Sequence, residues 1–156
     1  MKKSFYKILT AVSLLLVLTM TACFAQIMPP AEQLADDLTY SAGEWRSKTR
    51  SDEFTITYTD YGIYAGDGYV RISATTETNI MADSVGANMI VEQWTNNGWV
   101  EYDNFYFLAY DSSFATYAHN MPVESGHYYR LHVNHRAHYW ELLRTMDSYS
   151  KTVYVN

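Results

Sequence analysis

The chain has 156 residues, with 11 Lys and Arg against 17 Asp and Glu and a formal net charge of −6. This length fits one domain and is too short for a two-domain dinucleotide-binding enzyme or a (β/α)8 barrel. The acidic balance disfavours nucleic-acid binding, which needs a positive field against the phosphates. Composition therefore indicates a single small domain that has no nucleic-acid partner.

The first 25 residues have the order of a secretory signal. Residues 1–7 carry three lysines and no acid, residues 8–20 are predominantly apolar, and residues 21–25 are mostly small. The apolar run is shorter than the roughly 20 residues of a membrane-spanning helix. We expect cleavage after Ala25 and a secreted protein without a membrane span after cleavage; an uncleaved membrane anchor is the alternative.

A second alternative concerns Cys23. Residues 20–23 read Met-Thr-Ala-Cys, which is close to a lipoprotein box, although Met20 stands where an aliphatic such as Leu is usual. Lipidation at Cys23 would hold the protein at the cell surface. Removal of residues 1–25 leaves 8 basic against 17 acidic residues, a charge of −9, and no cysteine. A domain without disulfides must be stabilised by its core.

Residues 26–43 differ in composition from the remainder of the expected mature chain. They contain two adjacent prolines and several acids. We interpret this segment as a flexible leader, with one or two helical turns after the prolines as the alternative. Residues 44–156 are then the folded domain.

From Trp45 onward the apolar residues recur with a period of two, which is typical of strands with one buried face. Turn residues separate the strands at Asp60–Gly62, Gly66–Gly68 and, most clearly, Asn96–Gly98. The seven predicted strands are Phe54–Tyr58, Tyr69–Thr76, Val85–Trp94, Trp99–Tyr110, Phe114–Met121, Tyr128–His135 and Lys151–Val155. No stretch has a helical period. The pattern predicts an all-β, immunoglobulin- or fibronectin-like sandwich, with a small barrel as the alternative.

Alternation also predicts which side chains face the core. The expected inward residues are Phe54, Ile56, Tyr58, Val70, Ile72, Ala74, Val85, Ala87, Met89, Val91, Tyr129, Leu131, Val133, Val153 and Val155.

The segment from Val123 to Val133 places an aliphatic residue six positions before Tyr129, with Gly126 between them. This spacing resembles the tyrosine corner of immunoglobulin-like sandwiches, in which a Tyr hydroxyl returns to a nearby backbone group. We assign that role to Tyr129 and expect Tyr128 to face the opposite side.

The signal sequence, the segment Val123–Arg130 followed by His135, and the hairpin Asn97–Trp99 together resemble small secreted proteins of Firmicutes. These belong to a domain family of unknown function with an expected β-sandwich. The resemblance covers roughly Phe54–Val155. It implies export and a sandwich fold, and it implies no catalytic residue because the family has none assigned.

Five histidines lie within 20 residues of one another: His119, His127, His132, His135 and His138. Zinc needs ligands that converge on one ion. On a strand His132 and His135 point to opposite faces. His135 and His138 could converge only if the chain turns between them, and they are the candidates for a zinc site. We expect no metal and no cofactor.

Catalytic patterns are scarce. The expected mature chain has no cysteine, and no Gly-x-Ser-x-Gly elbow is present. Glu101 and Asp103 would share one strand face and could flank a sugar, as the two carboxylates of a glycosidase do. We favour a protein that is not an enzyme, with a hydrolase built on such a pair as the alternative.

Aromatic residues are dense around the Asn96–Gly98 turn. Alternation places Phe105 and Phe107 on the core side. The candidate binding residues are the other aromatics of that hairpin, Trp94, Trp99, Tyr102, Tyr106 and Tyr110. Exposed aromatic rings can stack on sugars or anchor a protein, whereas tyrosines also simply pair across strands.

These observations predict an exported, non-catalytic binding or interaction module whose partner is an unknown extracellular glycan or protein. The alternatives are a carbohydrate-binding module that uses the exposed aromatics and a structural, self-assembling surface protein that uses its edge strands.

Overall fold

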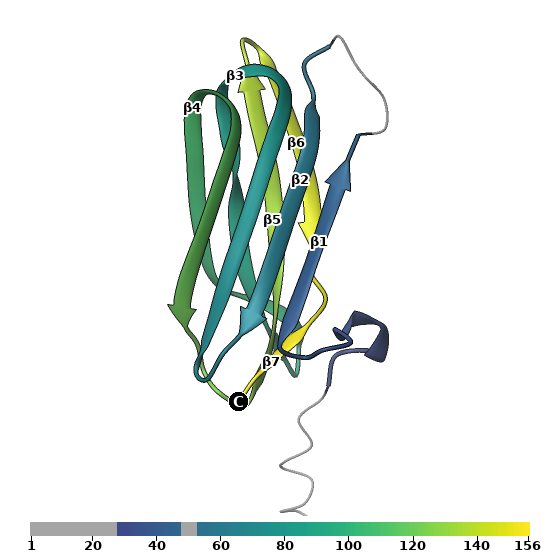
Figure 1. Ribbon diagram of the computed structural model, residues 1–156. Helices are drawn as coiled ribbons and strands as arrows, with labels where there is room; N and C mark the ends of the chain where they lie inside the picture. Colours follow the sequence, from purple (N-terminus) through teal and green to yellow (C-terminus); the bar gives the residue numbers. More distant parts are fainter. Residues whose placement is uncertain (1–27, 48–52) are drawn as a thin grey trace, which may run out of the picture.

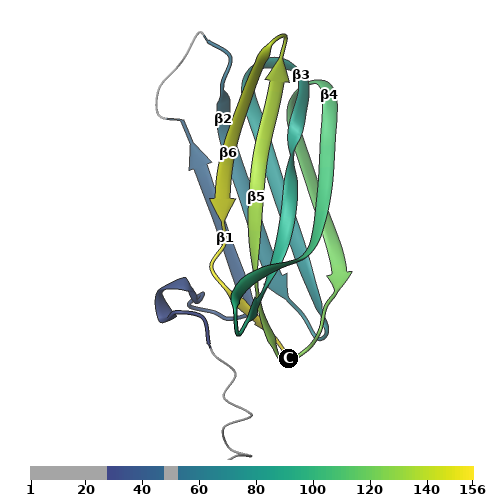
Figure 2. The same cartoon turned by 180° about the vertical axis from the view of Figure 1, so that it is seen from behind.

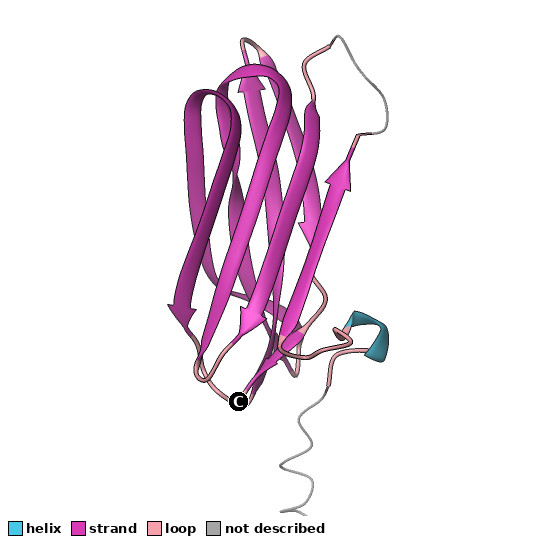
Figure 3. Ribbon diagram, viewed as in Figure 1, coloured by secondary structure: helices cyan, strands magenta, loops and turns pink. Residues whose placement is uncertain are grey.

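The computed structural model describes residues 28–47 and 53–156. It confirms an all-β protein of seven antiparallel strands (Figures 1 and 3). The elements are a 3-10 turn η1 (Ala31–Gln33) and strands β1 (Tyr40–Arg46), β2 (Ile56–Ala65), β3 (Tyr69–Thr95), β4 (Gly98–Pro122), β5 (His127–Tyr139), β6 (Leu142–Tyr149) and β7 (Val153–Val155). The expected signal sequence, with Cys23, lies outside the described residues. Within them, no helix is long and apolar enough to cross a membrane.

Two long strands run through both layers of the sandwich. The start of β3 pairs with β2 and with the end of β4, whereas the rest of β3 pairs with β5 and with the start of β4. The front layer is therefore β1, β2, residues 69–77 of β3 and residues 114–122 of β4 (Figure 1). The back layer is residues 98–112 of β4, residues 82–95 of β3, β5 and β6 (Figure 2), and β7 pairs with the start of β5. Both strands bend at the same end of the molecule.

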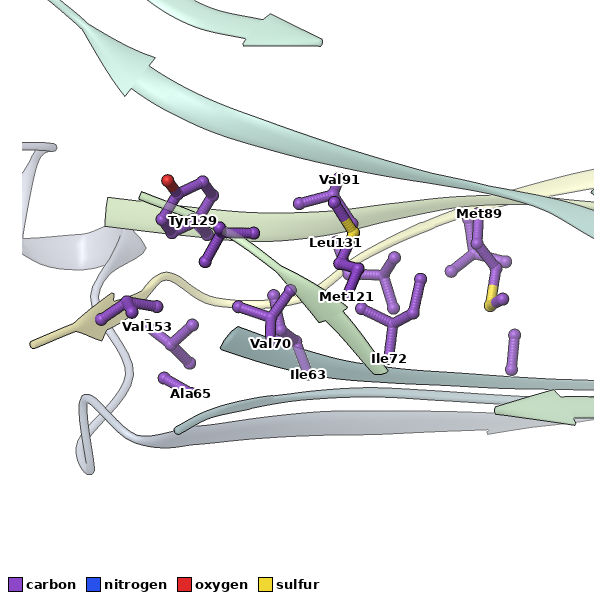
Figure 4. Close-up of a cluster of buried hydrophobic side chains, with 14 of the residues drawn as sticks. Ile63, Ala65, Val70, Ile72, Met89, Val91, Met121, Tyr129, Leu131 and Val153 are labelled. Atoms are coloured by element: carbon purple, nitrogen blue, oxygen red, sulfur yellow. The ribbon is translucent and has the colours of Figure 1, made fainter. Parts of the chain in front are cut away.

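The core lies between the two layers (Figure 4). Twelve of the predicted inward residues are fully buried: Val70, Ile72, Ala74, Val85, Ala87, Met89, Val91, Tyr129, Leu131, Val133, Val153 and Val155 are each 0% exposed. Burial of an aliphatic side chain contributes about 1.5–3 kcal/mol. Period-two alternation therefore identified most of the core correctly.

The hydroxyl of Tyr129 donates to the carbonyl of Glu124 at 2.9 Å, which is the bond of a tyrosine corner. Gly126 precedes it with φ +79°, a left-handed conformation that favours glycine. Burial raises the pKa of Tyr129 to about 12. The neighbouring Tyr128 ring packs instead against Tyr154, with ring centres 4.8 Å apart.

The assignment of Tyr58 to the core is wrong, because β2 contains a bulge. Ile56 pairs with Thr78 and Tyr58 with Glu77, so Thr57 is an extra residue that reverses the alternation. The ring of Tyr58 instead lies 4.6 Å below the guanidinium of Arg46.

The boundary between a leader at 26–43 and a domain at 44–156 is also wrong. Residues 40–43 belong to β1, which pairs with β2. Further upstream, the amide of Ala35 donates to the carbonyl of Thr152 at 3.0 Å. The segment lacks apolar alternation because its backbone bonds, rather than a row of buried side chains, attach it to the sandwich.

Other element boundaries also differ from the prediction. The predicted breaks after Thr76 and Tyr110 are bends within β3 and β4, and Asp60–Gly62 lies inside β2. Strand β5 continues to Tyr139, and β6 follows after a two-residue turn. The breaks predicted after Thr76 and Tyr110 are bends because β3 and β4 cross there from one layer to the other.

Candidate functional site

The outer face of the back layer carries a connected group of polar and aromatic side chains. Strand β5 lies inside this layer, between β3 and β6. Its odd-numbered residues from Tyr129 to Ala137 point into the core and are buried. Its even-numbered residues are all polar and point outward: Arg130, His132, Asn134, Arg136 and His138.

Five of the outward side chains form a continuous series of ring contacts, which we call the stacked ladder: Trp94, Trp99, Arg130, Tyr149 and His132. The two tryptophans meet edge to face at 5.1 Å. The guanidinium of Arg130 lies 4.4 Å from the ring centre of Trp99 and 5.1 Å from that of Tyr149. Tyr149 in turn stacks on His132 at 4.2 Å, with their planes 10° apart. Cation–π and stacking contacts thus fix the ring of Tyr149 in place.

Arg130 is also paired with a carboxylate. Its Nε donates to Oε2 of Glu92 at 2.5 Å, and the side chains of Arg130 and Glu92 are 20% and 17% exposed. A half-buried charge-assisted pair of this kind is rigid. Arg130 therefore orients the ladder and is not itself free to bind.

A second set of residues lies in register across four strands of the layer. Tyr106 on β4 is followed by Asn88, Asn134 and Asp147, and we call these last three the polar row. Four neighbouring strands span about 14 Å. Asn134 Nδ2 donates to Asp147 Oδ1 at 3.1 Å, and Nε2 of His132 lies 2.8 Å from the same oxygen. These two hydrogen bonds hold the pKa of Asp147 below its usual value, His132 contributing most. The Asp147 side chain remains 53% exposed.

The polar row lies between two exposed phenol rings. Tyr106 is 53% exposed and Tyr149 is 50% exposed. The guanidinium of Arg136 stands 5.7 Å from the ring centre of Tyr106. In the middle, the Oδ1 atom of Asn88 is buried without a hydrogen-bond partner. The face thus presents planar amide and carboxylate groups between two flat aromatic surfaces.

The structure does not unite the five predicted binding aromatics. Tyr106 and Tyr110 are exposed on the outer face. Trp94 and Trp99 are half-buried in the ladder, and Trp99 Nε1 donates to Oε1 of Gln33 at 3.0 Å. Tyr102 instead meets the ring of Tyr129 edge to face, 5.5 Å between centres.

A second bulge explains the position of Tyr102. Glu101 pairs with Glu92 and Asp103 with Val91, so Tyr102 is the extra residue on β4. Val91 is buried and Glu92 faces outward, hence Glu101 and Asp103 lie on opposite faces. The predicted shared face, on which the glycosidase alternative depended, is wrong.

The two weak metal candidates do not converge. His135 is fully buried between the layers, whereas His138 faces outward with its Nδ1 atom 3.7 Å from Oδ2 of Asp83. Across residues 28–47 and 53–156, no group of three or more His, Cys, Asp or Glu side chains could hold a metal ion.

His135 is instead a buried core residue that is hydrogen-bonded to Thr76. The Thr76 hydroxyl lies 3.0 Å from the carbonyl of Gly86 and 2.8 Å from His135 Nδ1. Both bonds form when the hydroxyl donates to Gly86 and accepts from Nδ1–H. Nε2 is then the unprotonated nitrogen, and it is buried without a partner. Burial lowers the pKa of His135 to about 4, against a small opposing effect of Asp147.

Sequence reasoning missed the residues contributed by β5 and β6. The outward polar positions of β5 were visible as every second residue of a strand. Tyr149 and Asp147 were not, because β6 begins with the exposed residues Leu142 and Leu143 and shows no inward apolar alternation.

Comparison with protein-family models gives no match for this chain, and comparison with curated proteins gives none either. The resemblance to small secreted Firmicutes proteins therefore stays a prediction.

Proposed function

We propose that this protein is an exported, non-catalytic binding module and that its ligand is a carbohydrate. The observation that supports this is the polar row between the rings of Tyr106 and Tyr149. Sugars present hydroxyl groups around their rim and C–H groups on their faces, so they are bound by planar polar side chains beside flat aromatic rings.

The dimensions of the row suit a short oligosaccharide. A span of about 14 Å across four strands accommodates two or three sugar rings lying across the layer. Asp147 and Asn134 offer an acceptor and donors to hydroxyl groups, while Arg136 adds a cation beside Tyr106. Tyr106 and Tyr149 stand near the two ends of this span.

Preorganisation supports the same proposal. The ladder fixes Tyr149 through Arg130 and His132, and Asp147 is held by two hydrogen bonds. Little side-chain entropy is then lost when a ligand binds, which favours affinity on a shallow surface. The proposal that the protein is exported rests on the secretory signal expected at residues 1–25.

A glycan screen tests the proposal. The purified protein is applied to an array of plant, fungal and bacterial cell-wall oligosaccharides, including peptidoglycan fragments. Tyr106→Ala and Tyr149→Ala should each weaken binding of any ligand found by about tenfold. Tyr64→Ala is the matched control, because Tyr64 is a similarly exposed tyrosine, 43%, on the front layer. This variant should bind the glycan as tightly as the parent protein does. A screen without any ligand would sink the carbohydrate version.

A further inference from the structure

The long strand β4 offers an unpaired edge along the front layer. Strand β4 pairs only with β3 among the described residues, so both of its halves are sheet edges. An unpaired edge is a template for another strand, and proteins usually protect such edges with charged residues.

Edges elsewhere in the sandwich carry charges. Strand β1 has Glu44 and Arg46, β6 has Arg144 and Asp147, and the first half of β4 has Glu101 and Asp103. Strand β7 is covered by residues 33–38, since Tyr154 N donates to Leu38 O at 2.7 Å. In contrast, residues 112–122 of β4 contain no Asp, Glu, Lys or Arg.

The hydrogen-bond pattern identifies which backbone groups face outward. Val123 N donates to Gly68 O at 3.1 Å, and antiparallel pairs alternate from there. Odd-numbered residues of this half therefore bond to β3, while Thr116, Ala118 and Asn120 direct their N–H and C=O groups to the free edge.

Both ends of this short edge are closed. Toward the bend, the Ser112 hydroxyl donates to Phe114 O at 2.8 Å and accepts from Phe114 N at 3.2 Å. At the other end stands Pro122, which as an even-numbered residue directs its backbone toward the free edge. Proline has no N–H, so this position offers no donor to a partner strand. Only the stretch from Thr116 to Asn120 is open to a partner.

We infer that this stretch of β4 pairs antiparallel with the same stretch of a second copy of the chain, with Ala118 on the two-fold axis. This register sets Thr116 against the partner's Asn120 and Ala118 against the partner's Ala118, forming about six backbone bonds. No like charges meet along it, and Tyr117 faces the partner's His119, as aromatic cross-strand pairs do. The closed ends stop the pairing at a dimer.

The row through Ala118 supplies a matched control. Ala42, Gly62, Ser73 and Ala118 lie in one register row across the front layer. Ala42 and Ala118 are thus exposed alanines on the same face, at the two opposite edges.

Sedimentation of the exported, processed protein from micromolar to millimolar concentration tests the pairing. The protein should shift from monomer to dimer, since an interface this short is weak. Ala118→Lys should weaken the dimer by about tenfold, because two ammonium groups then meet at the axis. Ala42→Lys should leave it unchanged, and both variants should keep the unfolding midpoint of the parent.

Cross-linking gives an independent readout. Hydrogen-bonded antiparallel partners have Cα atoms about 5.5 Å apart, within disulfide range. Ala118→Cys should give a covalent dimer under mild oxidation, whereas Ala42→Cys and the parent protein should not. A parent protein that stays monomeric at millimolar concentration overturns the inference. So does a dimer dissociation constant that Ala118→Lys leaves unchanged, or cross-linking at position 42 that equals cross-linking at 118.

Discussion

Strands β4 and β5 have similar sequence character and opposite situations in the fold. Both place mostly apolar or aromatic residues at the alternate positions that face the core. The inner residues of β5 from Tyr129 to Ala137 are at most 1% exposed, whereas in β4 only Ala115 and Met121 are buried. The difference arises because β5 has neighbours on both sides and β4 is an edge throughout. Alternation therefore predicts which way a side chain points, and position in the sheet decides how deeply it is buried.

The largest expected effect comes from truncating an inner residue on each strand. Leu131→Ala on β5 removes a fully buried side chain and should lower the free energy of unfolding by about 2–5 kcal/mol. Phe107→Ala on β4 removes a half-buried ring that stacks on Tyr117 at 5.6 Å, and should cost about 1–2 kcal/mol. Urea unfolding of both variants measures the difference, and equal losses would contradict the contrast between the strands.

Acid should weaken the β5 side of the core through His135. Its pKa is about 4 in the folded state, against the ordinary histidine value of 6.5 in the unfolded chain, so the unfolded chain binds the proton first as pH falls. Stability is then complete above pH 6.5 and falls by about 3 kcal/mol toward pH 4. Urea unfolding at a series of pH values measures this slope.

Two variants test whether His135 causes that dependence of stability on pH. His135→Gln should flatten it, and His138→Gln, on the outward side of the same strand, should retain it. Should His135→Gln fail to fold, the NMR titration of His135 in the parent protein decides, and a midpoint near 6.5 would refute the burial argument.

The tyrosine corner should contribute less. Tyr129→Phe keeps the buried ring but loses the bond to Glu124 O and the one accepted from Gln93 Nε2 at 3.1 Å. We expect a loss of about 1–2 kcal/mol in urea unfolding. A change within experimental error would mean that water replaces both bonds.

The smallest effect is expected at the β4 surface. Tyr110→Ala removes a side chain that is 72% exposed, so stability should change by less than about 0.5 kcal/mol. Thermal unfolding checks this, and a clear loss would show that the exposed face of β4 is packed against something.

Much of the fold could be predicted because its central strands follow strict alternation, as the fully buried Val70, Ile72, Met89 and Leu131 illustrate. Single extra residues defeated the alternation pattern. The bulge at Thr57 misplaced Tyr58, the bulge at Tyr102 misplaced Tyr102 and Glu101, and nothing local in the sequence marks either bulge. The site was predicted only in part for a different reason. Tyr106 was found on its strand, while Tyr149 depends on β6, a strand without a buried apolar row.

The central proposal is that the polar row and its flanking tyrosines bind a carbohydrate, and amide NMR during titration with a glycan from the screen tests it most directly. We expect the side-chain amide signals of Asn88 and Asn134 to shift with saturation, together with the backbone signals of Tyr106 and Asp147. The side-chain amide of Asn120, on the β4 edge of the front layer, should stay unchanged. Shifts confined to Asn120 and its neighbours, with Asn88 and Asn134 unmoved, would contradict the proposal.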